Sequence, residues 1–184
     1  IENFKGFEGR FSLELKDGIN ILVGDNGAGK STILEAIHLA LTGLYNGKHI
    51  TNCLSQYLFN NMTVANYLQS IQNGTPIAPP TIRVELYFNK PINAELFEGN
   101  YNTDNVAGAE GLQIEIAYNN MYDEEYKKII ENKELASLPI EYYDVSWTTF
   151  ARRTITPKSI PVKVAMIDSS NYRYQNGSDV YISR

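Results

Sequence analysis

The chain has 184 residues, a formal net charge of −5, 43% hydrophobic residues and 20% charged residues, which is ordinary for one globular domain with a hydrophobic core. It contains no run of 18 apolar residues and no secretory signal, so it predicts neither a membrane span nor export, and we expect a cytoplasmic protein. The single cysteine, Cys53, cannot form an internal disulfide, and together with two histidines it supplies too few ligands for an ordinary metal site.

The first predicted elements are a short strand at Ile1–Phe4 and an antiparallel hairpin. Apolar and polar residues alternate over Phe11–Leu15, and Lys16–Gly18 is a turn signal. The run that follows, Ile19–Val23, is short and rich in β-branched residues, which is typical of a buried strand. This strand leads directly into the most informative motif of the chain.

Residues 24–32 read Gly-Asp-Asn-Gly-Ala-Gly-Lys-Ser-Thr, the complete spacing of a phosphate-binding P-loop. The glycines at 24, 27 and 29 let the backbone approach an anion, so that successive N–H groups point at phosphate oxygens. The loop then opens a helix, whose first N–H groups lack intrahelical partners and whose dipole favours negative charge. The motif therefore predicts a nucleotide-binding protein.

Three side chains of the loop have separate predicted tasks. Lys30 reaches the β- and γ-phosphates and is the candidate catalytic residue, and the Ser31 hydroxyl is the candidate protein ligand of Mg²⁺. Thr32 is expected to contact the α-phosphate. The nucleotide-binding residues predicted from the motif are Asn26, Gly27, Ala28, Gly29, Lys30, Ser31 and Thr32.

A helix is predicted from Ser31 to Leu41, because apolar residues recur there at helical spacing and Gly43 stands where a left-handed C-cap is favoured. His38 lies on this helix without an identifiable catalytic partner, and we interpret it as a hydrogen-bonded structural residue. Thr63 is expected to cap a second helix that continues through Ile71 and is ended by two prolines at 79–80.

Alternating patterns predict half-buried strands at Ile82–Phe88 and Leu112–Tyr118. The segment between them, Asn89–Gly111, has almost no apolar periodicity and is interpreted as a mobile loop. The remaining predicted elements are a charged helix at Asp123–Asn132, a tyrosine-rich strand at Ile140–Trp147 and a strand at Ile160–Ile167. The chain starts with Ile1 and stops at Arg184 where a new element is expected to begin, so we expect an excised piece of a longer protein.

The acidic balance bears on nucleic-acid binding, since a domain that holds DNA over its whole surface is normally basic. Any DNA contact must therefore be local. The best local candidate is a basic cluster near two aromatic residues, and a solvated loop explains it equally simply. The cluster consists of Arg152, Arg153, Lys158 and Lys163, and the aromatic residues are Trp147 and Phe150.

The sequence resembles a known family at its N-terminus. Residues 1–7 (Ile-Glu-Asn-Phe-Lys-Gly-Phe) and the run from Asp17 through the P-loop to Ile37 are similar to the opening of ABC-type ATPase heads of the RecF, SMC and OLD (overcoming lysogenization defect) group. Two later runs, Ser137–Tyr143 and Ser178–Arg184, resemble OLD-family ATP-dependent endonucleases. The N-terminal motif is highly specific for the larger group, whereas the later runs point more weakly to the OLD family.

The resemblance implies an α/β P-loop NTPase fold, in which residues 1–184 form the first lobe of an ABC-type ATPase head with a mixed sheet and an antiparallel β-subdomain. It also implies ATP and Mg²⁺ as cofactors, and heads that self-associate so that each ATP lies between the P-loop of one head and the signature motif of the other. Lys5 occupies the position of the family's basic residue that approaches the nucleotide phosphates. DNA would be reached through the parent protein, with no role for a membrane.

Parts of such an enzyme are expected to lie outside residues 1–184. Hydrolysis needs carboxylates for Mg²⁺ and for water, and the group supplies them from an apolar strand that ends in Asp-Glu. The run most similar to this strand ends at Asp168, with Ser169 in place of Glu. No convincing glutamine loop can be assigned at Gln56, Gln113 or Gln175. The leading hypothesis is the ATPase lobe of an OLD-like enzyme, whose parent couples ATP hydrolysis to DNA cleavage by a separate TOPRIM domain. The alternative is a RecF- or SMC-type DNA-repair or clamp ATPase without nuclease activity.

Overall fold

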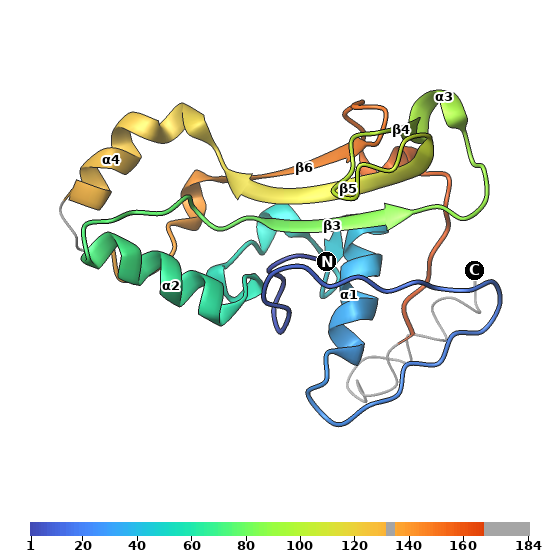
Figure 1. The fold of residues 1–184 in the computed structure, drawn as a ribbon, viewed down its shortest axis with the longest axis horizontal. Helices are drawn as coiled ribbons and strands as arrows, with labels where there is room; N and C mark the ends of the chain where they lie inside the picture. Colours follow the sequence, from blue (N-terminus) through green and yellow to red (C-terminus); the bar gives the residue numbers. More distant parts are fainter. Residues whose placement is uncertain (132–134, 168–184) are drawn as a thin grey trace.

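A computed structural model describes residues 1–131 and 135–167. Its centre is an antiparallel sheet in which β5 (Ala109–Tyr118) lies between β3 (Ile82–Tyr87) and β6 (Tyr143–Thr149) (Figure 1). The short strand β4 (Glu98–Gly99) pairs with the beginning of β5. The strands predicted around residues 82–88 and 112–118 are therefore confirmed.

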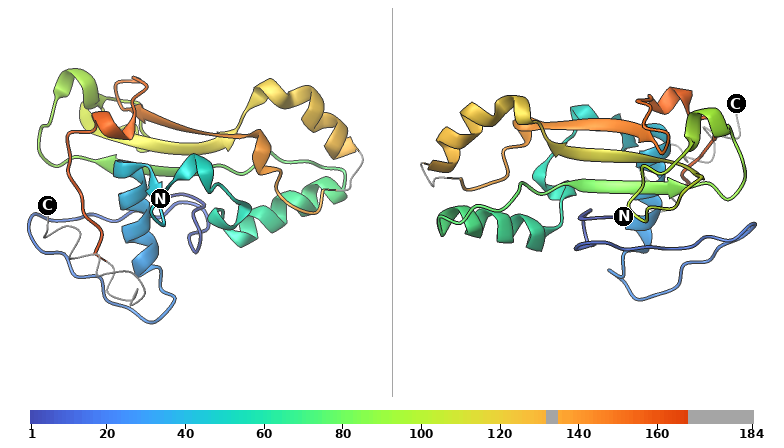
Figure 2. Two further views of the ribbon diagram at one scale, coloured as in Figure 1. Left: turned by 180° about the vertical axis from the view of Figure 1, so that it is seen from behind. Right: turned by 45° about the horizontal axis from the view of Figure 1, so that its top comes forward.

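Helices α1 (Lys30–Thr42) and α2 (Asn61–Gln72) lie on the same side of this sheet (Figures 1 and 2). The alternation along β3 explains why, since Ile82 and Val84 are buried toward the helices. On β6 the indole of Trp147 also faces this side, and its Nε1–H donates to the Ala40 carbonyl of α1 at 3.1 Å. The main core therefore lies between the sheet and the helices.

Short elements connect these parts. They are β1 (Leu44–Tyr45), β2 (Lys48–His49), α3 (Ala94–Phe97), α4 (Asp123–Glu131) and five 3₁₀ turns at Ile50–Asn52, Gln56–Leu58, Asn120–Tyr122, Ile140–Tyr142 and Pro157–Ser159. The charged helix predicted from Asp123 is thus confirmed as α4. It sits at one end of the sheet, and α3 sits at the other (Figure 1).

The helix that follows the P-loop is confirmed with its cap. Gly43 has φ 70°, the left-handed conformation predicted for it, and its N–H donates to the Leu39 carbonyl at 2.8 Å. The cap of α2 differs from the prediction. Asn60, rather than Thr63, accepts hydrogen bonds from the N–H groups of the first turn, and α2 ends at Gln72, well before the two prolines.

The segment Asn89–Gly111 is not a structureless mobile loop. It contains α3, β4 and the first residues of β5, and the Phe97 side chain is fully buried. Glu110 orders the entry to α3, because its carboxylate accepts from the N–H groups of Ile92 and Asn93. Elements as short as α3 and β4 leave no periodic pattern in the sequence, which is why the prediction was wrong.

Two predicted strands differ in the structure. The tyrosine-rich strand starts at Tyr143 instead of Ile140, because residues 140–142 form a 3₁₀ turn. Residues 161–167 belong to no strand, although their side chains alternate between half-buried and exposed. Val162 and Val164 pack against the core without a ladder of backbone hydrogen bonds. An alternating pattern reports one buried side, and it does not guarantee a neighbouring strand.

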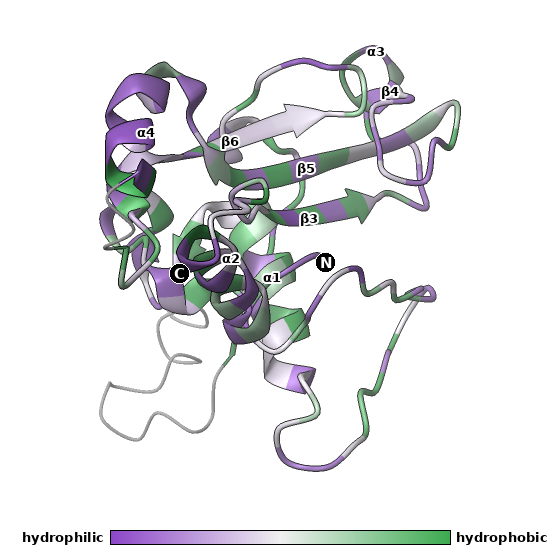
Figure 3. Ribbon diagram, turned by 60° about the vertical axis from the view of Figure 1, so that its left-hand side comes forward, coloured by the Kyte–Doolittle hydropathy of each residue, from purple (hydrophilic) through white to green (hydrophobic). Residues whose placement is uncertain are grey.

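The largest correction concerns the strand and hairpin before the P-loop. In the structure Ile19, Ile21 and Val23 are 92%, 80% and 88% exposed, and residues 19–23 belong to no strand. The tight turn at Lys16–Gly18 does form, with hydrogen bonds in both directions between Lys16 and Asn20, but the two arms do not pair. Among the described residues no strand lies beside this segment, so its apolar side chains remain uncovered. In Figure 3 the segment runs as an extended tube apart from the sheet.

Close packing at one glycine of β5 generates a stability prediction. A Cβ at Gly111 would lie 2.2 Å from Cε2 of Phe150 and 2.4 Å from the Leu86 carbonyl oxygen. Phe150 is fully buried and the carbonyl belongs to the partner strand, so neither can yield easily. We expect Gly111→Ala to lower the free energy of unfolding by about 1–3 kcal/mol, as overpacking does.

Chemical denaturation followed by circular dichroism measures this change. The matched control is Gly6→Ala, since no atom lies within 4 Å of a Cβ built there. Equal unfolding midpoints for the two variants would contradict the packing argument.

Candidate nucleotide-binding site

The P-loop adopts a conformation that only glycine takes easily. Gly27 and Gly29 have φ 87° and 86°, in the left-handed region. Gly29 is constrained a second time, because a Cβ there would lie 2.8 Å from Cζ of Phe7. The loop therefore stands against the N-terminal segment of the chain through Phe7, whose ring also stacks on Phe11 with centroids 4.5 Å apart.

The loop leads straight into α1, as the motif requires. Gly29 is the N-cap of the helix, makes no side-chain capping bond, and its carbonyl accepts from Ile33 N–H at 3.0 Å. No acidic residue lies in the first turn. The backbone N–H groups at this end have no intrahelical acceptors, and the helix dipole makes the end positive. This arrangement suits an anion such as phosphate.

Lys30 folds back over the loop. Its Nζ donates to the carbonyl oxygens of Gly24 and Asp25, both at 2.7 Å. These bonds hold the ammonium at the mouth of the loop, where phosphate oxygens could replace the carbonyls. Ser31 is exposed and Thr32 half-buried beside it. The structure thus gathers the predicted P-loop residues at one helix end, and their contacts with a nucleotide remain a prediction.

Lys5 lies in the N-terminal segment of the chain, and its side chain contacts α1. Its ammonium lies 2.5 Å from Oε2 of Glu35 and 5.5 Å from the centre of the Tyr45 ring. Partial burial disfavours the charged form, but the hydrogen bond to Glu35 and the neighbouring Tyr45 side chain outweigh it and raise the pKa of Lys5 above its ordinary value. Lys5 is therefore a firmly protonated side chain that is already paired within the protein.

Backbone contacts fix the position of Lys5. It has φ 51°, its N–H donates to the Leu58 carbonyl at 2.8 Å, and its own carbonyl accepts from Asn60 Nδ2 at 2.9 Å. The preceding Phe4 is fully buried. The turn that carries Lys5 is thus held by the segment that caps α2, and it is not a solvated turn.

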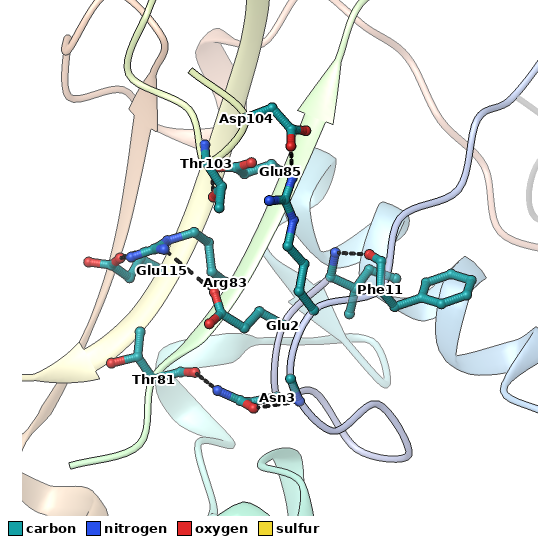
Figure 4. Close-up of polar contacts among 12 residues, drawn as sticks. Glu2, Asn3, Phe11, Thr81, Arg83, Glu85, Thr103, Asp104 and Glu115 are labelled. Carbon is teal, nitrogen blue, oxygen red and sulfur yellow. Dashed lines mark hydrogen bonds and ion pairs between the residues drawn. The ribbon is translucent and has the colours of Figure 1, made fainter. Parts of the chain in front are cut away.

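The N-terminal segment, predicted as a strand at Ile1–Phe4, forms no strand and joins the sheet through one isolated backbone bridge and side-chain contacts (Figure 4). Glu2 bridges to Arg83 of β3, and the Arg83 guanidinium bonds to Glu115 on β5 at 2.6 Å. Asn3 Nδ2 donates to the Thr81 carbonyl at 3.0 Å. These contacts tie the turn at residues 3–7 to the sheet, which in turn packs on α1.

Sequence reasoning missed two residues of this site, Glu35 and Phe7. Glu35 follows Ser31 by four positions, which places both on the same face of the helix, and that spacing is the signal that could have found it. Phe7 had no signal of its own, because its contact with Gly29 joins segments that only the fold brings together.

Other candidates have structural tasks. His38 Nδ1 lies 3.3 Å from the Leu44 carbonyl and 3.4 Å from the Thr42 hydroxyl, consistent with the structural interpretation. The Gln56 side chain accepts from Leu138 N–H, and Gln113 Nε2 donates to the Thr148 hydroxyl. Asp168 and Gln175 lie outside the described residues.

The basic cluster does not form the aromatic-lined surface that its sequence suggested. Trp147 and Phe150 are 5% and 0% exposed, so neither ring can stack on a base. Arg152 instead lies over the Tyr101 ring at 5.2 Å. Arg153 and Lys158 are exposed, which fits a solvated loop.

No cluster of three or more His, Cys, Asp or Glu side chains within residues 1–131 and 135–167 could hold a metal ion. A Mg²⁺ bound by Ser31 would rely mainly on phosphate oxygens and water, which is how this ion is commonly held. In the same part of the chain, no helix combines the length and the apolar character that crossing a bilayer requires.

Several curated proteins match parts of the chain. It is 40% identical over 80 residues to the retron Ec83 probable ATPase of Escherichia coli, covering 42% of this chain and 14% of that protein. It is 56% identical over 41 residues to the DNA double-strand break repair Rad50 ATPase of Methanopyrus kandleri, covering 22% and 5% of the two chains. It is 47% identical over 55 residues to the DNA replication and repair protein RecF of Chlorobium phaeovibrioides, covering 29% and 15%.

The chain therefore spans at most 15% of the length of these relatives. No solved structure gives a significant match. The model of the AAA domain family matches residues 1–159, which is most of the chain, and the chain therefore belongs to that family.

Proposed function

We propose that this chain is the MgATP-binding part of an ABC-type ATPase that acts in DNA repair, of the kind represented by Rad50 and RecF. The observation that carries the proposal is the complete P-loop at residues 24–32, placed at the N-terminus of α1 with Lys30 held over the loop. The family assignment and the relatives described as ATPases support it.

Binding would use the donors that lie at the N-terminus of α1. The loop N–H groups and the positive end of α1 would hold the β- and γ-phosphates, and Lys30 would exchange its two carbonyl acceptors for phosphate oxygens. The exposed Ser31 hydroxyl would supply one oxygen ligand to Mg²⁺, which neutralises phosphate charge when bound. Lys5 adds a second ammonium near the same helix.

The described residues provide binding more clearly than hydrolysis. Glu35 on α1 is engaged by Lys5 and is not free to activate water. We therefore propose that hydrolysis requires further parts of the protein, including a second head that completes the site by self-association. The exposed apolar side chains of Ile19, Ile21 and Val23 support further protein against this side, because contiguous exposed apolar side chains commonly mark a surface that another protein part covers.

DNA would be handled by the parent protein. The names of two relatives refer to DNA repair, and this supports a repair role.

A second candidate is an OLD-like enzyme that cleaves DNA with another domain, which the run Ser137–Tyr143 favours. Plasmid nicking by the full-length parent protein in Mg²⁺ and ATP would support the nuclease. A plasmid that stays intact while the protein hydrolyses ATP would argue against the nuclease and favour a repair ATPase without nuclease activity.

Lys30→Ala tests the nucleotide site. We expect MgATP affinity to fall by about tenfold or more, because a charge-assisted hydrogen bond to phosphate is lost. Isothermal titration calorimetry with MgATP measures the change. The matched control is Lys127→Ala, which removes an exposed lysine on α4 at the far end of the sheet and should bind like the wild type. Equal affinity of Lys30→Ala and wild type would overturn the proposed site.

Hydrolysis by the chain alone tests the need for further parts. We expect residues 1–184 to bind MgATP and to release phosphate no faster than a protein-free control, since a clear pair of catalytic carboxylates is missing from its sequence. A coupled phosphate-release assay measures this rate. Rapid turnover that is abolished in Asp168→Asn would instead show that Asp168 serves the reaction within this chain.

A further inference from the structure

We propose that Glu35 is a positioning residue for the nucleotide site, which holds the Lys5 ammonium beside the phosphate-binding turn of α1. The inference rests on the proposed function, because a role for Lys5 at the phosphates requires that the P-loop binds a nucleotide. It adds a residue that takes no part in the P-loop motif and acts only through Lys5.

The helix itself places Glu35 correctly. Glu35 follows Ser31 by four residues and Thr32 by three, so it is a surface neighbour of each of them, with Cβ atoms about 5–6 Å away. Side chains of a helix lean toward its N-terminus. The Glu35 carboxylate therefore extends back toward the turn that carries Ser31 and Thr32, and it brings its partner Lys5 with it.

The end of the Lys5 side chain is held from two directions. Its Nζ lies 2.5 Å from Glu35 Oε2, and the Tyr45 ring lies 5.5 Å away. The side chains of Lys5 and Glu35 are 29% and 21% exposed, so the pair is largely shielded from water. An ammonium has three donors. Glu35 uses one of them, which leaves donors available for a phosphate oxygen.

The start of the Lys5 side chain is fixed as well. Leu58 and Asn60 hold the backbone N–H and carbonyl of Lys5, as described above. A lysine that is anchored at both ends has already lost the rotamer freedom that a free lysine would lose on binding a ligand. Glu35 therefore prepares Lys5 for the nucleotide before the nucleotide arrives.

A carboxylate near phosphate could also oppose binding or compete for Lys5. In this structure the Glu35 charge is already compensated by the ammonium, and one acceptor oxygen occupies only one of three donors. Lys5 can therefore serve Glu35 and phosphate together without leaving its place. Positioning and competition predict changes of affinity in opposite directions, and a purely stabilising ion pair predicts none.

A double-mutant cycle on the whole chain tests the proposal. Glu35→Ala, Lys5→Met and the double variant are titrated with MgATP by calorimetry. We expect Glu35→Ala to weaken binding by roughly 3- to 20-fold in the wild-type background, and by less than about twofold in the Lys5→Met background, as for contacting residues that act as a unit. Glu35→Gln keeps an oxygen acceptor for Lys5 and should retain most of the affinity.

Controls separate this role from folding and from simple charge. Glu124→Ala removes an exposed carboxylate on α4 and should leave MgATP affinity unchanged. Alanine is the best helix former, so Glu35→Ala should fold, and Glu35→Met is a second variant of similar length if it does not. Thermal unfolding followed by circular dichroism verifies the folded state of each.

The outcomes are distinct. Unchanged affinity in Glu35→Ala would reduce the pair to a structural contact, and tighter binding would make Glu35 a competitor. Either result would overturn the inference while Lys30→Ala still weakens binding. If Lys30→Ala has no effect on MgATP, the proposed nucleotide site fails and the role of Glu35 fails with it.

Discussion

The packing of one sheet face on α1 is the constraint on which the rest of the structure depends. The register of β3, β5 and β6 lines up Val84, Ile114 and Trp147 across that face. Trp147 then donates to a carbonyl inside α1, which joins the strand farthest from β3 to the helix. Because the P-loop opens the same helix, this contact sets where a bound phosphate would lie relative to the sheet.

Contacts at β3 position the N-terminal residues of the site. The N-terminal segment is attached to β3 through Glu2 and Arg83, and this attachment brings Lys5 and Phe7 to the beginning of α1. The position of the P-loop is thus fixed in two ways. The sheet holds α1, which follows the loop, and Phe7 of the N-terminal turn packs against Gly29. On the N-terminal side of the P-loop, residues 19–23 form no strand within the described part of the chain. The site is therefore supported on the side of α1 and exposed on the side of residues 19–23.

The elements that depend on interactions between residues close in sequence could be predicted from the sequence. The P-loop, α1 with its Gly43 cap, and β3 follow from spacing, periodicity and glycine conformation within a few residues. The pairing of residues 19–23 could not be predicted, because an apolar run shows that a strand needs neighbours without showing whether they are present. The same limit applies to Lys5 and Glu35, which are 30 residues apart and are brought together by the packing of the turn at residues 3–7 in the folded chain.

The two lysines differ in what they can contribute to an anion site. Lys30 bonds to backbone carbonyls, which carry no net charge, so its full positive charge is available to phosphate. Lys5 is neutralised by Glu35, so the pair adds little net attraction and contributes mainly a fixed donor. In the proposed site, strong binding would depend on Lys30 and the helix end, whereas Lys5 would contribute orientation. Such a site would attract phosphate mainly through Lys30 and the helix end, and it would align the phosphate through Lys5.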